Sequence, residues 1–198
     1  IVNTNVFKNL NLGIDPKLFT SEQIKKFFLK NNEVTSINEN LVDNILKAQN
    51  KKSSPFYSIS EKITGENHLK KISKVASFLK KNKSDYLFIT APENIAWLLN
   101  IRGHDNPTSP IPNCNLILSK EKKFYLIVEK SKSTKLIGEK KLKKEQIVDP
   151  KNFSNFLKRL KNKNVIIDQK TCSLYLEKLF RKRHKLIKKE DPIYLLKS

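Results

Sequence analysis

The stretch ENIAWLLNIRGHD, from Glu93 to Asp105, decides the fold of this chain of 198 residues. Pro92 immediately before it is typical of the first turn of a helix, where a missing N–H costs nothing. The apolar run that follows contains the chain's one Trp and predicts a short helix through Asn100. A glycine and three prolines come next, within residues 101–113, so this segment is predicted to be a loop.

Three titratable side chains lie at the start of this loop: Arg102, His104 and Asp105. Loops carry binding and catalytic residues more often than core elements do, which makes these three the candidates for a functional site. A structural role is the alternative interpretation. Arg102 and Asp105 would then tie the loop down as an ion pair, and Gly103 would take a special backbone conformation.

Short apolar runs flank the decisive stretch. They predict strands at Asp85–Thr90, Asn115–Leu118, Phe124–Val128, Val165–Ile167 and Leu186–Ile187. The polar segment 119–123 joins two of these strands, which predicts a hairpin. Helical patterns alternate with the strands, and this alternation indicates an α/β layered domain.

Helix signals are clearest near the start of the chain. Thr20 and Gln23 form a capping box, and the helix after them is predicted to bury Ile24, Phe27 and Phe28. A further helix is predicted to begin after Thr64, with Leu69, Ile72, Val75, Ala76 and Leu79 on one face. The other predicted helices lie at residues 41–46, after Asp149 and Pro150, at 174–180 and at 192–196.

The sequence also repeats itself. Lys8–Lys17 aligns with Lys161–Lys170, and six of the ten positions are identical. In both copies the pattern predicts a strand that ends in Asp, then a helix, a short strand and a short helix. Repeated units of this kind are a clue to the fold, because each copy must build the same local structure.

A polar stretch without periodicity, Ala48–Pro55, separates the two copies. We therefore predict that residues 1–50 are the carboxy-terminal part of a first domain and that 51–55 are a linker. Residues 56–198 are predicted to form a second, complete domain.

The chain is strongly basic. Lys and Arg number 40 and Asp and Glu number 19, which gives a formal charge of +21. Nucleic-acid binders carry such a charge, and the basic stretch Lys178–Lys189 keeps that interpretation open. However, only four of the basic residues are Arg, and no exposed aromatic residues interleave the basic stretch for base stacking. Since AT-rich genomes encode Lys, Asn and Ile, we predict a lysine-coated surface and no nucleic-acid partner.

Common catalytic motifs are absent from the sequence, including the dinucleotide, Walker and zinc-protease patterns. His68 and His184 are predicted to be solvated. Asp15, Asp85 and Asp168 stand singly beside turns, and each is predicted to cap a turn or helix. No catalytic residue and no metal ligand is predicted in this chain.

Cys114 and Cys172 lie in apolar neighbourhoods without metal-ligand spacing, so they are predicted to be small core residues. No apolar run approaches the roughly 20 residues of a membrane span, and no signal-peptide pattern opens the chain, so no membrane partner is expected. The sequence contains no Met, and we therefore expect the chain to be a piece of a longer protein.

The run from Ile95 to Pro107 resembles the middle domain of the Xaa-Pro aminopeptidases, whose members typically show IAWLLN-x-RG-x-D-x-P. Leu12–Phe19 with Asn40–Asp43 is similar to the close of that family's first domain, and Pro192–Lys197 is similar to the entry into its catalytic domain. His104 stands at a position that varies in the family. The chain departs from the family after Asp43, where a Trp and an Arg-Pro pair are usual.

The resemblance implies a creatinase/prolidase amino-terminal (RNase H-like) fold, a layered α/β domain with a mixed sheet and flanking helices, preceded by the tail of a second copy. It implies a parent enzyme that removes the amino-terminal residue before Pro, with two divalent metals, Mn²⁺ or Zn²⁺, activating water. The metal ligands of the family belong to its last domain. None of them is assigned to a position in this chain, so no cofactor is expected here.

Two hypotheses of different classes follow. In the first, the chain is a non-catalytic segment of a cytoplasmic Xaa-Pro aminopeptidase. It packs against its own catalytic domain, shapes access of the peptide substrate near Arg102, His104 and Asp105, and contributes to a homodimer. In the second, the chain is a free-standing Lys-rich α/β binding module without chemistry, and nucleic-acid binding is a less favoured variant of this hypothesis.

We predict that limited proteolysis of the chain cuts first between Ala48 and Pro55. The reason is that a polar linker between two packed units offers a protease an extended backbone. Mass spectrometry of the fragments checks this prediction. A first cut elsewhere, with the Ala48–Pro55 segment intact, would show that the predicted boundary is misplaced.

Overall fold

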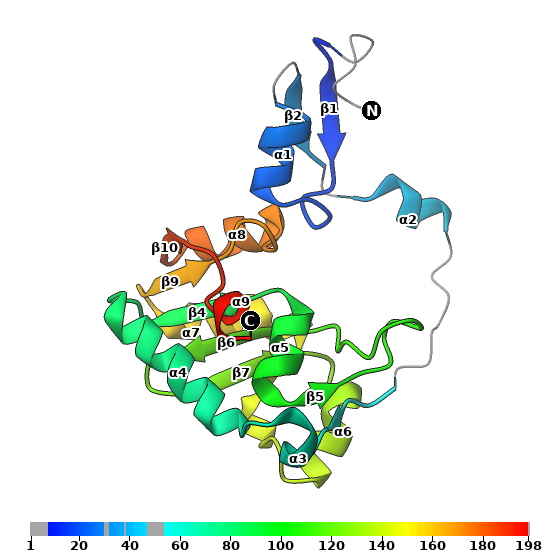
Figure 1. Cartoon of the computed structure of the whole chain (residues 1–198). Helices are drawn as coiled ribbons and strands as arrows, with labels where there is room; N and C mark the ends of the chain where they lie inside the picture. Colours follow the sequence, from blue (N-terminus) through cyan, green and yellow to red (C-terminus); the bar gives the residue numbers. More distant parts are fainter. Residues whose placement is uncertain (1–7, 30–31, 38, 47–53, 198) are drawn as a thin grey trace.

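A computed structural model of the chain describes residues 8–29, 32–37, 39–46 and 54–197 (Figure 1). Its centre is a six-stranded mixed sheet with the strand order β10-β9-β4-β6-β7-β8. The strands are β4 (Tyr86–Ile89), β6 (Asn115–Ser119), β7 (Phe124–Ile127), β8 (Ile147–Val148), β9 (Asn164–Ile167) and β10 (Lys185–Lys188). The predicted hairpin between β6 and β7 is confirmed.

Strand direction in this sheet is nearly uniform. β6 runs antiparallel to its neighbours β4 and β7, whereas β4 pairs in parallel with β9, β9 with β10, and β7 with β8. Five strands therefore start at the same end of the sheet. The turns that enter these strands share one end of the domain, and the turns that leave them share the other.

Helices cover both faces of the sheet. One core contains Leu87 together with residues of α4 (His68–Lys81), α5 (Pro92–Leu99), α6 (Lys130–Gly138) and α9 (Ile193–Leu196). The other core contains Phe88 together with residues of α7 (Phe153–Leu160) and α8 (Leu174–Arg181). Because successive strand residues point to opposite faces, Leu87 and Phe88 separate the two cores. This layered arrangement with a mixed sheet confirms the predicted fold class.

The amino-terminal piece lies above the main sheet in Figure 1. It consists of β1 (Asn11–Ile14) paired in parallel with β2 (Glu33–Ser36), together with α1 (Ser21–Phe27) and α2 (Leu41–Ile45). The capping box at the start of α1 is confirmed by both of its hydrogen bonds. Ile24 is buried, but the prediction for Phe27 is wrong, because that ring is 43% exposed. It packs edge-on against Phe28, whose other partner is Phe19.

The two copies of the repeat have the same local geometry. β1 pairs with β2 in parallel, as β9 does with β10. Asp15 and Asp168 each accept a bond of 2.8 Å from the backbone N–H two residues later. Five residues after these aspartates, Thr20 and Ser173 each cap a helix. The predicted order of elements is therefore confirmed in both copies.

The copies also meet each other at equivalent positions. Thr20 and Ser173 form an antiparallel bridge, and the N–H of Leu174 donates to the carbonyl of Phe19 at 2.8 Å. Residues 47–53, where most of the predicted linker falls, lie outside the described residues. The division into two domains thus stays a prediction.

Two local predictions are wrong. Thr64 ends the short helix α3 (Glu61–Thr64) instead of capping α4, because Gly65 turns the chain with a φ of 72°. The cap of α4 is Asn67, whose side chain accepts from the N–H of Leu69. The predicted loop after α5 begins as β5 (Ile101–Arg102), which pairs antiparallel with β3 (Tyr57–Ser58). A two-residue strand leaves no periodic pattern in a sequence, since its pairing is decided by a distant partner.

The prediction that His184 is solvated is also wrong. It is 6% exposed, and its ring lies 5.9 Å from that of Phe180. Its Nδ1 accepts from the N–H of Lys163 at 3.3 Å, and burial lowers the pKa of the imidazole. The cysteines behave as predicted: Cys114 and Cys172 are buried free thiols, and burial raises the pKa of both, that of Cys172 to about 12.

We expect Phe180→Ala to lower the free energy of unfolding by about 3–5 kcal/mol, because it removes a fully buried ring. That ring lies 4.5 Å from Phe88 and 5.8 Å from Phe153, measured between centroids. Tyr175→Ala, on the same helix but 43% exposed, is the matched control and should cost less than about 1 kcal/mol. Urea unfolding of both variants measures the difference, and equal losses would contradict this assignment of the core.

Candidate functional site

The candidate site is the segment that follows α5 and leads into β6. α5 ends at Asn100, which takes the left-handed conformation with φ 53° and ψ 48°. The Asn100 side chain is buried, and its amide nitrogen donates to the carbonyl of Glu66 at 2.8 Å. The direction in which the chain leaves α5 is therefore held by a contact with the segment before α4.

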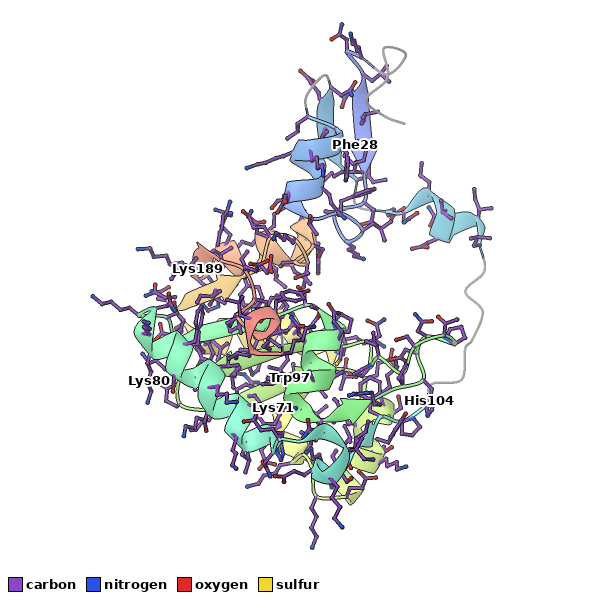
Figure 2. The ribbon with its side chains drawn as sticks, in the orientation of Figure 1. Phe28, Lys71, Lys80, Trp97, His104 and Lys189 are labelled. Atoms are coloured by element: carbon purple, nitrogen blue, oxygen red, sulfur yellow. The ribbon has the colours of Figure 1, made fainter. Side chains whose placement is uncertain are left out.

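A buried lysine completes this helix end. The Nζ of Lys71 donates to the carbonyl of Trp97 at 2.9 Å and to Oδ1 of Asn100 at 2.7 Å. It also lies 4.3 Å from the centre of the Trp97 ring. Figure 2 shows the two residues next to each other. A cation at the carboxyl end of a helix is stabilised by the helix dipole. Burial nevertheless lowers the pKa of Lys71, because the ammonium has left water.

Arg102 does not pair with Asp105, so this expectation is wrong. Its Nη1 donates to the carbonyls of Ala96 at 3.2 Å and Ile101 at 2.8 Å. The guanidinium thus binds one carbonyl of the last turn of α5 and one of β5, a contact that only the folded backbone creates.

The expectation for Gly103 is also wrong, because its φ is not positive. The reason for glycine is space. A Cβ at this position would lie 2.8 Å from the Cα of Pro112 and 3.0 Å from two ring atoms of Phe56. The N–H of Gly103 donates to the carbonyl of Pro110 at 3.0 Å, which closes the loop on itself.

The partner of Asp105 is Lys132, on α6. Oδ1 of Asp105 lies 2.5 Å from the Lys132 Nζ, and Oδ2 accepts from the N–H of Asn113 at 2.6 Å. Both side chains of the pair are only 16% exposed. Sequence reasoning missed Lys132, since one lysine among many in a basic chain carries no distinguishing signal.

His104 is the one exposed member of the three candidates. Its ring stacks on that of Tyr57, with 5.1 Å between centroids and 24° between planes, and it lies at the outer side of the molecule (Figure 2). The structure therefore does not bring Arg102, His104 and Asp105 together as one constellation. It offers an exposed imidazole on a loop that buried contacts of Arg102 and Asp105 hold in place.

Asp85 and His68, which the sequence also singled out, make structural contacts. Asp85 accepts from Lys120 and from the N–H of Asn164, so it ties β4 to its neighbours as well as standing beside a turn. His68 is half-buried rather than solvated. Burial and the nearby charge of Lys141, whose Nζ lies 2.9 Å from Nδ1, lower the pKa of His68 to about 4.

Asp168 is buried and, besides its turn, accepts from the N–H of Asp191 at 3.0 Å. Asp191 in turn accepts from the Asn94 side chain at 2.8 Å, and burial raises its pKa. These contacts fasten the segment before α9 to α5. Within the described part of the chain, no three His, Cys, Asp or Glu residues lie together as a metal ion would require.

Comparison with known proteins agrees with this architecture. The sequence profile described as the Creatinase/Prolidase N-terminal domain matches residues 47–198. The chain belongs to this family. The match includes the Trp97 helix, the loop after it and the whole six-stranded sheet, so the family fold accounts for the position of the candidate site.

The relatives of this creatinase/prolidase N-terminal domain are long enzymes. A Laccaria bicolor protein named "Probable Xaa-Pro aminopeptidase P" is 31% identical over 117 residues, which are 54% of this chain and 18% of that protein. A Dictyostelium discoideum "Xaa-Pro aminopeptidase 1" is 29% identical over 153 residues, 70% of this chain and 23% of that protein. The chain thus spans about a fifth of the length of these relatives.

The crystal structure of an X-prolyl aminopeptidase from Caenorhabditis elegans shares the fold with a TM-score of 0.70 at 21% identity. The match covers 92% of this chain and 32% of that one, which is described as a cytosolic enzyme with a di-nuclear active site. No helix among the described residues is long and apolar enough to cross a bilayer.

We expect a double-mutant cycle to couple Asp105 with Lys132 and not with Arg102. Asp105→Asn with Lys132→Gln should give a coupling free energy of about 1 kcal/mol or more, because the pair is largely shielded from water. Asp105→Asn with Arg102→Gln should be additive within about 0.5 kcal/mol. Denaturant unfolding of the variants gives both coupling free energies. A larger coupling of Asp105 with Arg102 than with Lys132 would support the Arg102–Asp105 pair instead.

Proposed function

We propose that this chain is a non-catalytic segment of a metal-dependent Xaa-Pro aminopeptidase, an enzyme that removes the amino-terminal residue before Pro. The observation that carries the proposal is the combination of family and length: the matched relatives are named Xaa-Pro aminopeptidases, and the chain aligns with about a fifth of each. The two divalent metals, Mn²⁺ or Zn²⁺, belong in this proposal to a different domain. The described residues offer no cluster that fits them.

In this proposal the loop after α5 faces the catalytic domain and borders the substrate channel. Arg102 and Asp105 shape the loop through the backbone carbonyls of α5 and through Lys132. His104, which no buried contact holds, is the side chain that meets the peptide or the domain that binds it. A cytosolic location, which the Caenorhabditis elegans enzyme is described as having, and a homodimer are further parts of the same proposal.

Kinetics of the complete enzyme test the role of the loop. We expect His104→Ala to change kcat/KM for an Xaa-Pro peptide about tenfold while the melting temperature stays the same, because the ring is exposed. Lys62→Ala, an exposed residue on α3, is the matched control and should leave both unchanged. Unchanged kinetics for His104→Ala would contradict the placement of the loop beside the substrate channel. The loop would then have a structural role only.

The alternative is a free-standing Lys-rich α/β binding module. Incubation of the 198-residue chain and of the complete enzyme with an Xaa-Pro peptide and Mn²⁺ separates the two. The proposal expects hydrolysis by the complete enzyme alone. Metal-dependent hydrolysis by the 198-residue chain would contradict a non-catalytic role. If the complete protein did not hydrolyse the peptide either, the binding module would be favoured.

A further inference from the structure

The positive charge of this domain is concentrated at one end of its sheet. Five turns, taken together with the ends of the helices and strands beside them, lie at the end where β4, β7, β8, β9 and β10 begin: residues 80–85, 119–123, 143–146, 158–164 and 181–185. They carry sixteen cations, which are Lys80, Lys81, Lys83, Lys120, Lys122, Lys123, Lys143, Lys144, Lys158, Arg159, Lys161, Lys163, Arg181, Lys182, Arg183 and Lys185. They carry three carboxylates, which are Asp85, Glu121 and Glu145. We call these five turns the cationic end.

The other end of the same strands is different. The turns at 90–93, 113–114, 128–131, 149–152, 168–171 and 189–192 carry four lysines against six carboxylates. The side chain of one of these four lysines, Lys189, extends toward the cationic end, where its Nζ donates to Oδ1 of Asn82. A lysine-rich composition alone would coat both ends, so composition does not explain this segregation.

Most charges of the cationic end are free to meet a ligand. Fourteen of the sixteen cations are exposed, all but Lys120 and Lys163. Among the described residues, Lys120 and Arg181 are the members that form ion pairs, with Asp85 and Glu177. Unpaired cations held on rigid turns repel one another, and a polyanion relieves that repulsion by releasing the counterions that both surfaces hold.

Lysine stands in these turns even where the backbone disfavours it. Lys83, Lys122 and Lys161 have φ values of 51°, 66° and 31°. Gly and Asn visit this left-handed region at lower cost than lysine does. Asn is also abundant in this chain, so a bias toward AT-rich codons would be satisfied equally well by Asn at these positions.

A pocket of about 330 Å³ lies in the cationic end and is lined by Asn162, Arg181, Lys182, Arg183, His184 and Lys185. No carboxylate lines it. Three of the chain's four arginines, Arg159, Arg181 and Arg183, lie in these turns. The planar guanidinium matches a phosphate with two parallel hydrogen bonds, which favours phosphate over carboxylate as the ligand.

We propose that the cationic end binds the phosphate backbone of a nucleic acid without reading its bases. The five turns contain no Phe, Tyr or Trp, so they offer no platform on which bases could stack. Backbone contacts need only cations and carry no sequence information. This proposal departs from the expectation of a lysine-coated surface without a nucleic-acid partner. It does not rest on the proposed function, because the cationic end lies on the side of the molecule opposite His104, as Lys80 shows in Figure 2.

The test is a fluorescence anisotropy titration of a labelled oligo(U) RNA with the 198-residue chain. At near-physiological salt we expect a dissociation constant on the order of 10⁻⁵ M. The affinity should fall steeply between about 50 and 200 mM salt, with a slope of roughly −0.7 for each phosphate neutralised. Labelled oligo(C) should bind within about threefold of oligo(U), because backbone contacts do not distinguish bases.

Two triple variants locate the site. Lys163→Gln with Arg183→Gln and Lys185→Gln removes three charges from the cationic end and should weaken binding at least about tenfold and lower the salt slope by about 2. Lys62→Gln with Lys130→Gln and Lys151→Gln removes the same charge from exposed residues elsewhere and should weaken binding less than about threefold. Thermal unfolding shows that both variants are folded.

Three outcomes would overturn the proposal. Absence of RNA binding at about 50 mM salt would remove it outright. Equal weakening by the two variants would mean that the net charge, not the cationic end, attracts the RNA. Poly-glutamate that competes as well as RNA at equal charge would identify the partner as an acidic polypeptide instead of a nucleic acid.

Discussion

Burial of β4 on both faces is the constraint on which the rest of the structure depends. Leu87 and Ile89 belong to one core and Phe88 to the other, and none of the three is more than 1% exposed. A strand that is apolar on both faces is stable only when helices cover both. The edges are closed too, since β6 and β9 pair with β4 on either side. The layers of helices and the central place of β4 follow from this one requirement.

The direction of the strands then separates two surfaces. Because five strands run the same way, every turn that leaves β4, β7, β8, β9 or β10 lies at one end of the domain and every turn that enters them lies at the other. The loop with His104 enters the single reversed strand, β6, and therefore shares the end where the others leave. The sheet thus carries the His104 loop at one end and a basic surface at the other.

Features that depend on neighbouring residues were predictable. The capping box of Thr20 and Gln23, the Pro92 start of α5 and the β6–β7 hairpin each rest on contacts within a few positions. The prediction that Thr64 caps α4 is wrong because Gly65, one residue later, ends the preceding helix α3 and turns the chain. No sequence pattern predicted α6, and its polar surface gives little periodicity, although Leu136 on it is fully buried.

The sequence by itself determined the layered α/β class, the repeat and the loop on which the candidate residues stand, because hydrophobic periodicity and turn residues act locally. Only the tertiary structure decided what those residues bind. In a chain with 40 basic residues, no pattern shows that Asp105 pairs with Lys132, 27 positions away, rather than with Arg102, three positions away. Packing around Phe56 brings Lys132 near, with its ammonium 5.6 Å from that ring. Partner choice among many equal charges is settled by which ones the folded backbone buries together.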